Sequence, residues 1–192
     1  VGLELVGIAP AKPVPDFDFF RWWLDQGFAG TMDWLGRGAV QRGDPEKILP
    51  GVRSIICCGI NYFTGQTGGP ISNYSWGDDY HKILGKRLKA LEGFLREIAP
   101  EAGTRSYVDT GAILERSYAA RAGLGWIGKN ACLINKGAGS WFFLGEIFTD
   151  LPLPIDEEAS AHCGTCTRCI DICPTQAIVA PNRVDARRCI SY

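Results

Sequence analysis

Apolar side chains recur at helical spacing between Tyr80 and Ile98, and this is the clearest element that the sequence predicts. The apolar positions lie three or four residues apart, and Pro100 ends the pattern. A shorter pattern with the same period predicts a second helix over residues 114–122. A cluster of aromatic residues over 17–24 predicts a third helix, short and heavily buried.

The strands are predicted by shorter apolar runs. Residues 54–60 form a continuous apolar run, which indicates a central strand buried on both faces. A glycine-rich loop over 64–73 then leads into the long helix. Further strands are predicted up to Ala9 and over residues 106–109, 131–134 and 141–148. The last two lie on either side of a glycine-containing turn at 136–139.

Composition and charge exclude several classes of protein. The 192 residues are 46% hydrophobic and 21% charged, which is an ordinary globular balance. Twenty Lys and Arg against 21 Asp and Glu give a net charge of -1, so the surface as a whole is not that of a nucleic-acid or membrane binder. No apolar run reaches the roughly 20 residues of a membrane span, and no signal peptide is recognisable. We therefore expect a cytoplasmic monomer that makes no membrane contact, or a piece of one.

An acidic stretch at 156–158, following two prolines, predicts a domain boundary. Residues 1–154 carry the alternating helix and strand patterns and are expected to form an α/β domain. Residues 155–192 contain five of the eight cysteines and are expected to form a separate small module.

The cysteine spacing in this module is chemically specific. The run Cys163-x2-Cys166-x2-Cys169-x3-Cys173-Pro174 is that of bacterial ferredoxins, in which three thiolates hold one four-iron cluster and the fourth ligates the other cluster. A zinc knuckle is the alternative, but zinc sites of four cysteines use two separated pairs. The run therefore favours iron–sulfur clusters.

The number of cysteines falls short of two complete clusters. With Cys189 the module offers five thiolates, whereas two four-iron clusters need eight. Cys57, Cys58 and Cys132 lie in predicted strands, where we expect them to be small buried hydrophobic residues rather than ligands. We therefore expect an incomplete ligand set, typical of an N-terminal fragment that stops partway through a two-cluster module.

Several blocks of the sequence resemble one enzyme family. The glycines of residues 123–128 have a spacing close to that of a dinucleotide-binding loop, but they follow a helix rather than a strand, which argues against a Rossmann fold. The blocks that carry the resemblance are Asp109-Thr110-Gly111, Glu115-Arg116, residues 27–30, 75–81, 121–130 and 139–146, and the cysteine run. In their order along the chain, these blocks resemble the epoxyqueuosine reductases and, more distantly, the reductive dehalogenases.

The resemblance implies a fold, an activity and partners. It implies a cobalamin-binding α/β sandwich domain followed by the beginning of a bacterial-ferredoxin-like two-cluster module. It also implies that the enzyme reduces epoxyqueuosine to queuosine in the anticodon loop of tRNA, the last step of queuosine synthesis. A low-potential electron donor is then required, because a strongly reducing cobalt centre is reached only through low-potential clusters.

The resemblance also assigns site residues. The residues alone favour an aspartate at position 109 that hydrogen-bonds the Thr110-Gly111 turn, but Asp109 matches the family's proposed proton donor, and the resemblance therefore assigns it that role. The metal ligands are the five cysteines of the module. The positions expected to contact cobalamin are Arg42, Ser72, Asp109, Lys129, Asn130, Leu133, Ser140 and Ser191. His81 lies on the apolar-periodic helix and is expected to be structural rather than a cobalt ligand.

Two alternatives remain at this point. One is a corrinoid enzyme that acts on a small substrate, such as a reductive dehalogenase. The other is an electron-transfer or cobalamin-carrier module without chemistry of its own. A change at Asp109 separates the carrier from the enzymes, because a carrier needs no proton donor.

Overall fold

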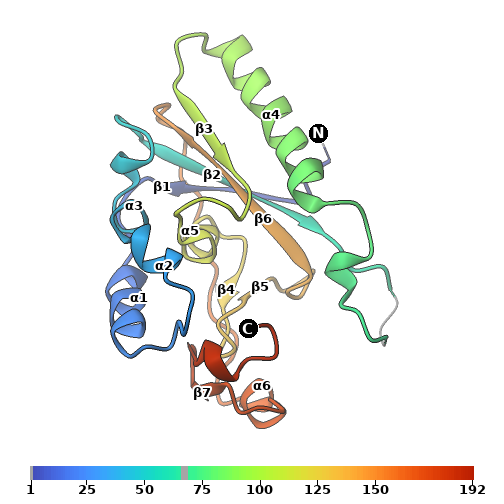
Figure 1. The fold of residues 1–192 in the computed structure, drawn as a ribbon. Coiled ribbons are helices and arrows are strands. Elements are labelled where there is room, and N and C mark those ends of the chain that lie inside the picture. Colours follow the sequence, from blue (N-terminus) through green and yellow to red (C-terminus); the bar gives the residue numbers. More distant parts are fainter. Residues whose placement is uncertain (1, 66–68) are drawn as a thin grey trace.

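A four-stranded antiparallel sheet forms the centre of the computed structural model, which describes residues 2–65 and 69–192 (Figure 1). Residues 66–68 of the predicted glycine-rich loop lie outside the described residues. The strand order is β1-β2-β6-β3. The strands are β1 (Leu5–Pro10), β2 (Ser54–Asn61), β3 (Thr104–Tyr107) and β6 (Phe142–Thr149).

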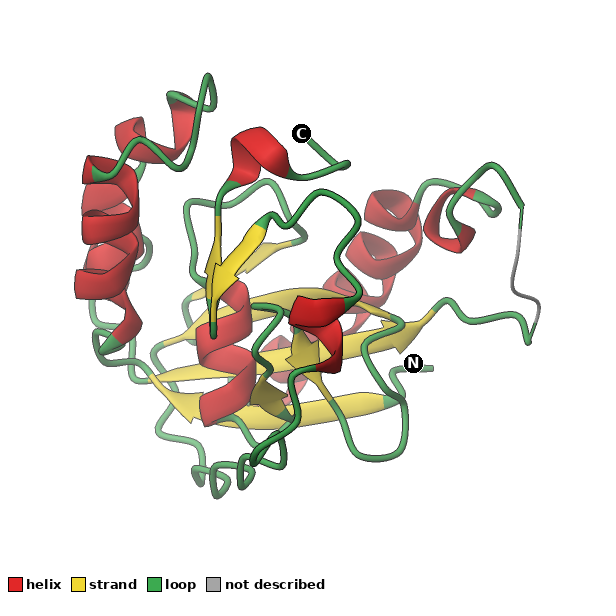
Figure 2. Ribbon diagram, turned by 90° about the horizontal axis from the view of Figure 1, so that it is seen from below, coloured by secondary structure: helices red, strands yellow, loops and turns green. Residues whose placement is uncertain are grey.

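Strand β2 is buried on both faces, as its sequence predicts. Ile55 and Cys57 belong to the core under helix α5 (Glu115–Arg121). Their neighbours Ile56 and Cys58 belong to the core under helix α4 (Tyr80–Ile98) on the opposite face. Successive side chains of a strand point to opposite faces, so a continuous apolar run is needed to fill both cores. Figure 2 shows helices on both sides of the sheet.

The predicted helix at 17–24 forms, but it is not heavily buried. Helix α1 spans Asp16–Asp25, and among the described residues none of its side chains is buried. It lies at the periphery, where its tryptophans contact the C-terminal module. The indole of Trp23 donates to the carbonyl of Val184 at 2.6 Å, and the guanidinium of Arg183 lies 4.9 Å from the ring centre of Trp22. The aromatic residues of α1 therefore form a contact between segments rather than a core.

The remaining helices are short. Helices α2 (Trp34–Arg37) and α3 (Ala39–Gly43) follow α1. Single 3-10 turns are η1 (Pro45–Lys47), η2 (Asn73–Ser75) and η3 (Ala186–Arg188). Among the described residues, no helix is long and apolar enough to cross a membrane.

Strands form on both sides of the turn at 136–139, as predicted, but the first is shorter than predicted and the two do not pair with each other. Only Leu133–Ile134 form a strand, β5, and it pairs with β4 (Trp126–Ile127). Ala131 has a left-handed φ of 62°, which interrupts the extended chain before β5. Strand β6 instead lies between β2 and β3, where its main chain has hydrogen-bonding partners on both sides.

The C-terminal segment lies at one end of the molecule, beyond β4 and β5 (Figure 1). Before it, Asp156 extends the hydrogen bonding of β1, because its N–H donates to the Ile8 carbonyl at 3.0 Å and its Oδ2 accepts from the Ile8 N–H at 2.8 Å. The segment itself contains α6 (Arg168–Asp171), β7 (Ile178–Ala180) and β8 (Arg183–Val184). It is tied back to Lys129, whose carbonyl accepts from the Asn182 N–H at 2.9 Å.

Candidate active site around Asp109

Asp109 lies in a tight turn directly after β3. Its φ is 58°, and the N–H of Thr110 donates across it to the carbonyl of Val108 at 2.6 Å. This is a γ-turn with positive φ, the rarer and more strained form. Aspartate tolerates the left-handed region better than most residues. The turn directs the carboxyl group outward, and the side chain is 62% exposed.

Two residues of the first turn of α4 meet this carboxyl group. The hydroxyl of Tyr80 donates to Oδ2 of Asp109 at 2.7 Å, and Nε2 of His81 lies 3.7 Å from the same oxygen. Nδ1 of His81 is 2.8 Å from Oδ1 of Asp79, which also accepts from the His81 backbone N–H as the helix N-cap. The ring of Tyr80 stacks between His81 and Phe143, with centroid distances of 4.0 and 3.9 Å.

Burial and hydrogen bonding fix the protonation states of Tyr80 and Asp79. Burial and the hydrogen bond to Asp109 raise the pKa of Tyr80, so its hydroxyl stays protonated and donates. The hydrogen bonds from His81 lower the pKa of Asp79, so this carboxylate remains charged and orients the imidazole ring.

Two glutamates lie under the Asp109 turn. Oε1 of Glu115, the first residue of α5, accepts from the backbone N–H of Asp109 at 2.8 Å. Glu146 on β6 is 0% exposed and faces Glu115 from the sheet. A carboxyl pair therefore sits between the sheet and the turn that carries the exposed aspartate.

A cavity of about 480 Å³ opens beside Asp109. It is lined by Trp34, Gly38, Arg42 and residues 109–112. Arg42 is 7% exposed, and its guanidinium donates to the Leu35 carbonyl at 3.3 Å. A lining of one aromatic residue, small residues and one cation held by a hydrogen bond suits a large, flat ligand with amide groups at its edge.

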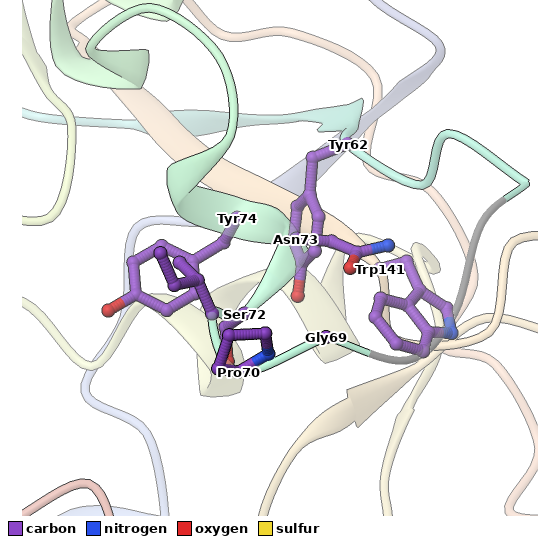
Figure 3. Close-up of a pocket in the computed structure, with 8 residues that line it drawn as sticks. Tyr62, Gly69, Pro70, Ser72, Asn73, Tyr74 and Trp141 are labelled. Carbon is purple, nitrogen blue, oxygen red and sulfur yellow. The ribbon is translucent and has the colours of Figure 1, made fainter.

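Ser72 lines a different cavity, of about 270 Å³, which Figure 3 shows in close-up. The rings of Tyr62 and Trp141 bound this cavity, with their centroids 5.9 Å apart, and Tyr74 lies on the other side of Ser72. The structure thus places Arg42 and Asp109 at one cavity and Ser72 at another.

The remaining predicted cofactor positions are spread along the loop around β5 and the C-terminal end. Nζ of Lys129 donates to the carbonyl of Gly164 at 2.8 Å, and Oδ1 of Asn130 accepts from the Cys132 N–H at 3.2 Å. The Leu133 side chain is buried in the core, so only its main chain is available to a ligand. Ser140 and Ser191 are exposed.

The cysteines of the C-terminal module have hydrogen-bond donors aimed at sulfur. The indole N–H of Trp126 donates to Sγ of Cys163 at 3.4 Å, and the N–H of Ala177 donates to Sγ of Cys173 at 3.3 Å. Main-chain N–H groups, that of Ile178 foremost, lower the pKa of Cys173 to about 7. The thiolate form is therefore favoured, as metal ligation requires.

All eight cysteines lie among the described residues, and all are free. Cys57 and Cys58 are 0% exposed, which confirms them as core residues. The prediction that Cys132 is buried is wrong, because the residue precedes β5 in a bend and is exposed. Within the described chain, no three His, Cys, Asp or Glu side chains converge on a single metal ion. The thiolates of a four-iron cluster bind different corners of the cluster and need not converge in that way.

Several residues of this site were not identified as functional from the sequence. Tyr80 and His81 were assigned to the apolar-periodic helix, yet both contact the Asp109 carboxyl. Glu115 and Glu146 stood out only as members of the family-like blocks. The signal that could have found them is an acidic residue within each of two predicted elements that are otherwise rich in apolar residues, because a buried charge needs a partner.

Comparison with known proteins decides the family. A family model described as "Epoxyqueuosine reductase QueG, DUF1730" matches residues 42–110. The epoxyqueuosine reductase of Xanthomonas campestris pv. campestris is 48% identical over 203 residues, covering 100% of this chain and 57% of that protein. The epoxyqueuosine reductase of Synechocystis is 45% identical, covering 97% of this chain and 67% of that protein. This chain belongs to the epoxyqueuosine reductase family.

Solved structures of the family agree. An epoxyqueuosine reductase with an epoxyqueuosine-modified tRNA stem loop superimposes with a TM-score of 0.89 at 32% identity, covering 99% of this chain and 53% of that one. A Bacillus subtilis epoxyqueuosine reductase, described with its aspartate-bearing catalytic loop swung out of the active site, gives 0.88 at 31% identity and covers 99% of this chain. The chain thus spans about half the length of these relatives.

The predicted fold class is also confirmed. A reductive dehalogenase shares the fold, with a TM-score of 0.53 at 15% identity over 94% of this chain and 22% of that one. A family model described as "4Fe-4S double cluster binding domain" matches residues 162–192. This match agrees with the iron–sulfur module predicted from the cysteine spacing.

Proposed function

We propose that this chain is the cobalamin-binding and proton-donating part of an enzyme that reduces epoxyqueuosine to queuosine in the tRNA anticodon loop. The observation that carries the proposal is the exposed Asp109 carboxyl at the rim of a cavity, fixed by the Tyr80 hydroxyl. The names of the relatives, and the tRNA stem loop in one of them, support the substrate.

The reaction removes an oxygen atom. Converting an epoxide to an alkene consumes two electrons and two protons and releases the oxygen as water. Cobalamin supplies a strongly reducing cobalt centre when it is bound, and the iron–sulfur clusters supply the electrons. The chain's own contribution is the first of the two protons, which we assign to the carboxyl group of Asp109 acting on the departing oxygen; the second proton comes from solvent and completes the water molecule.

Residues of this chain are available to hold the cofactor beside Asp109. Arg42 and residues 109–112 line the adjacent cavity, and Arg42 brings a cation to it. We further propose contacts from the predicted positions outside that cavity, which are Ser72, Lys129, Asn130, Leu133, Ser140 and Ser191. Their distribution over two loops and the C-terminal end requires a ligand that extends well beyond the cavity.

The clusters are assigned to the C-terminal module. Its ligands in this proposal are Cys163, Cys166, Cys169, Cys173 and Cys189, with Trp126 donating to the first of them. The division into units of residues 1–154 and 155–192 is proposed on the same grounds, since the sheet ends at Thr149 and the cysteines follow the linker.

We place the enzyme in the cytoplasm as a monomer. The proposal is supported by the tRNA substrate and by eight cysteines that are all free. Its electrons are expected to come from a low-potential donor protein, because low-potential clusters accept electrons only from a donor of similarly low potential.

The test is Asp109→Asn in the full-length enzyme. The variant should retain cobalamin and iron but lose turnover of epoxyqueuosine-containing tRNA by about 10²–10⁴, the usual effect of a lost general acid. Asp25→Asn, an exposed position on α1, is the matched control and should turn over normally. Near-normal turnover of Asp109→Asn with cofactors bound would remove Asp109 from the mechanism and favour a carrier function.

A further inference from the structure

The Glu115–Glu146 pair is an unusual feature for a protein core. Glu146 is 0% exposed, and with its carboxylate ionised neither of its oxygens has a hydrogen-bond donor within the described structure. Buried polar atoms without partners are rare, and each one calls for an explanation. The ionisable side chain that faces Glu146 most directly is Glu115, itself partly buried.

A single proton shared by the two carboxyl groups would give Glu146 a hydrogen-bond partner. If Glu146 carries the proton, its hydroxyl donates to the Glu115 carboxylate, and one buried charge is removed. Glu115 then accepts from Glu146 on one side and from the Asp109 N–H, at 2.8 Å, on the other. The result is a continuous chain of hydrogen bonds from β6, through α5, to the turn that carries Asp109.

We propose that Glu115 and Glu146 share one proton and act as a positioning pair that holds the backbone of Asp109 in its left-handed turn. Strained backbone conformations persist only where their surroundings fix them. The Asp109 turn is fixed at its main chain by Glu115 and at its side chain by Tyr80. The Bacillus subtilis epoxyqueuosine reductase is described with its aspartate-bearing catalytic loop swung out of the active site, so in that protein such a loop leaves its place.

The charges around the pair agree with this assignment. Burial raises the pKa of Glu146 well above its usual range, and the nearby Glu115 raises it further. Burial, and then the Asp109 charge, raises the pKa of Glu115 to about 7. The other titratable groups near the pair are Arg116 on α5, Arg42 on α3, Tyr80 on α4, Cys57 and Cys58 on β2, and Tyr107 on β3, which is paired with Glu146.

The proposal predicts that the strength of the hydrogen bond from the Asp109 N–H to Glu115 depends on pH. Below about pH 7 both carboxyls are protonated, and Glu115 offers the Asp109 N–H only a neutral acceptor. Above that pH Glu115 is ionised and the bond becomes charge-assisted, which makes it shorter and stronger. The turn should therefore tighten as the pH rises through 7, while Glu146 keeps its proton.

The experiment follows the Asp109 amide by NMR in the full chain without substrate. The wild-type amide resonance should titrate with a midpoint of about 7. Glu115→Gln should abolish this titration, and Glu92→Gln, a buried glutamate on α4, should leave it unchanged. A titration that survives in Glu115→Gln, or is absent from the wild type, would overturn the proposal.

Two further variants separate proton donation from simple burial. Glu146→Gln still offers an N–H to Glu115, so hydrogen exchange at the Asp109 amide should stay slow and the midpoint should fall. Glu146→Leu offers no donor, and the same amide should exchange at least about tenfold faster above pH 7. Equal exchange in the two variants would show that Glu146 donates nothing. If Glu146→Leu does not fold, the wild-type and Glu115→Gln titrations still decide the question.

The role of the Glu115–Glu146 pair in catalysis rests on the proposed function, but the NMR titration of the Asp109 amide does not depend on it. If Asp109→Asn leaves turnover intact, Asp109 is not the donor, and the amide titration is unaffected. If the titration is absent while Asp109→Asn is inactive, the proposed function stands and the positioning pair does not.

Discussion

The hydroxyl of Tyr80 lies 2.7 Å from Oδ2 of Asp109 and ties the first turn of α4 to the turn after β3. The two residues are 29 positions apart in the sequence, and the helix cap at Asp79 fixes the start of α4 from which Tyr80 projects. The position of the exposed carboxyl therefore depends on how a helix and a strand end meet.

Removal of this hydroxyl should reduce turnover moderately. Tyr80→Phe keeps the ring stacked on Phe143 but loses one hydrogen bond, worth about 1 kcal/mol at a partly exposed site, or roughly fivefold in rate. Single-turnover rates on epoxyqueuosine-containing tRNA measure the loss. In an Asp109→Asn background the same change should cost almost nothing further, because the bond acts through that carboxyl. Fully additive losses would place Tyr80 in a separate role.

The indole of Trp126 should tune the cluster that Cys163 ligates. Trp126→Phe removes the N–H donor 3.4 Å from the sulfur and should make the cluster's potential more negative. A hydrogen bond of about 1 kcal/mol corresponds to roughly 40 mV for one electron. An EPR-monitored redox titration measures the shift. Trp23→Phe, which loses only a bond to the Val184 carbonyl, should leave the potential unchanged.

The buried glutamates should make the folded state less stable as the pH rises. The pKa of Glu115 rises from its usual 4.5 to about 7 on burial, so the folded state binds more protons than the unfolded state in this window. The resulting stability is present in full below pH 4.5 and is lost as the pH rises through 7, by on the order of 1–3 kcal/mol.

Urea unfolding between pH 4.5 and 8 measures this slope. In Glu146→Gln the unfolding free energy should fall less steeply with pH, because the raised pKa of Glu146 is removed and the pKa of Glu115 falls. Glu92→Gln should keep the wild-type slope. Stability that increases across this range, in the wild type, would contradict the assignment of a protonated buried pair.

A close approach of two main chains should make Gly7 intolerant of any side chain. A Cβ atom at Gly7 would lie 2.0 Å from the carbonyl oxygen of Ala122, at the end of α5. Gly7→Ala should therefore destabilise the protein by about 3 kcal/mol or more, because β1 or α5 must move. Gly93→Ala, on α4 with open space around it, should instead stabilise it by about 0.5–1 kcal/mol. Urea unfolding of both variants measures the contrast, and similar effects would contradict it.

Parts of the candidate site were accessible from the sequence. The family-like blocks pointed to Asp109, and the spacing of the cysteine run pointed to iron–sulfur ligation, because both signals lie within a few neighbouring residues. The roles of Tyr80, Glu115 and Glu146 were not accessible in this way. Each comes from a different element, and their approach to Asp109 depends on how α4, α5 and β6 pack.

By itself the sequence determined the elements that neighbouring residues encode: the helix over 80–98, from its 3.6-residue period, and the buried strand beginning at Ser54, from its apolar run. Only the tertiary structure decided that β6 lies between β2 and β3 rather than pairing with β5. That choice depends on the hydrogen bonds and buried area of the whole sheet, which no local pattern records. The same packing placed Glu146 on β6 opposite Cys57 and under the turn of Asp109. The tertiary structure therefore also decided that the Glu146 carboxyl group is the one that must keep a proton.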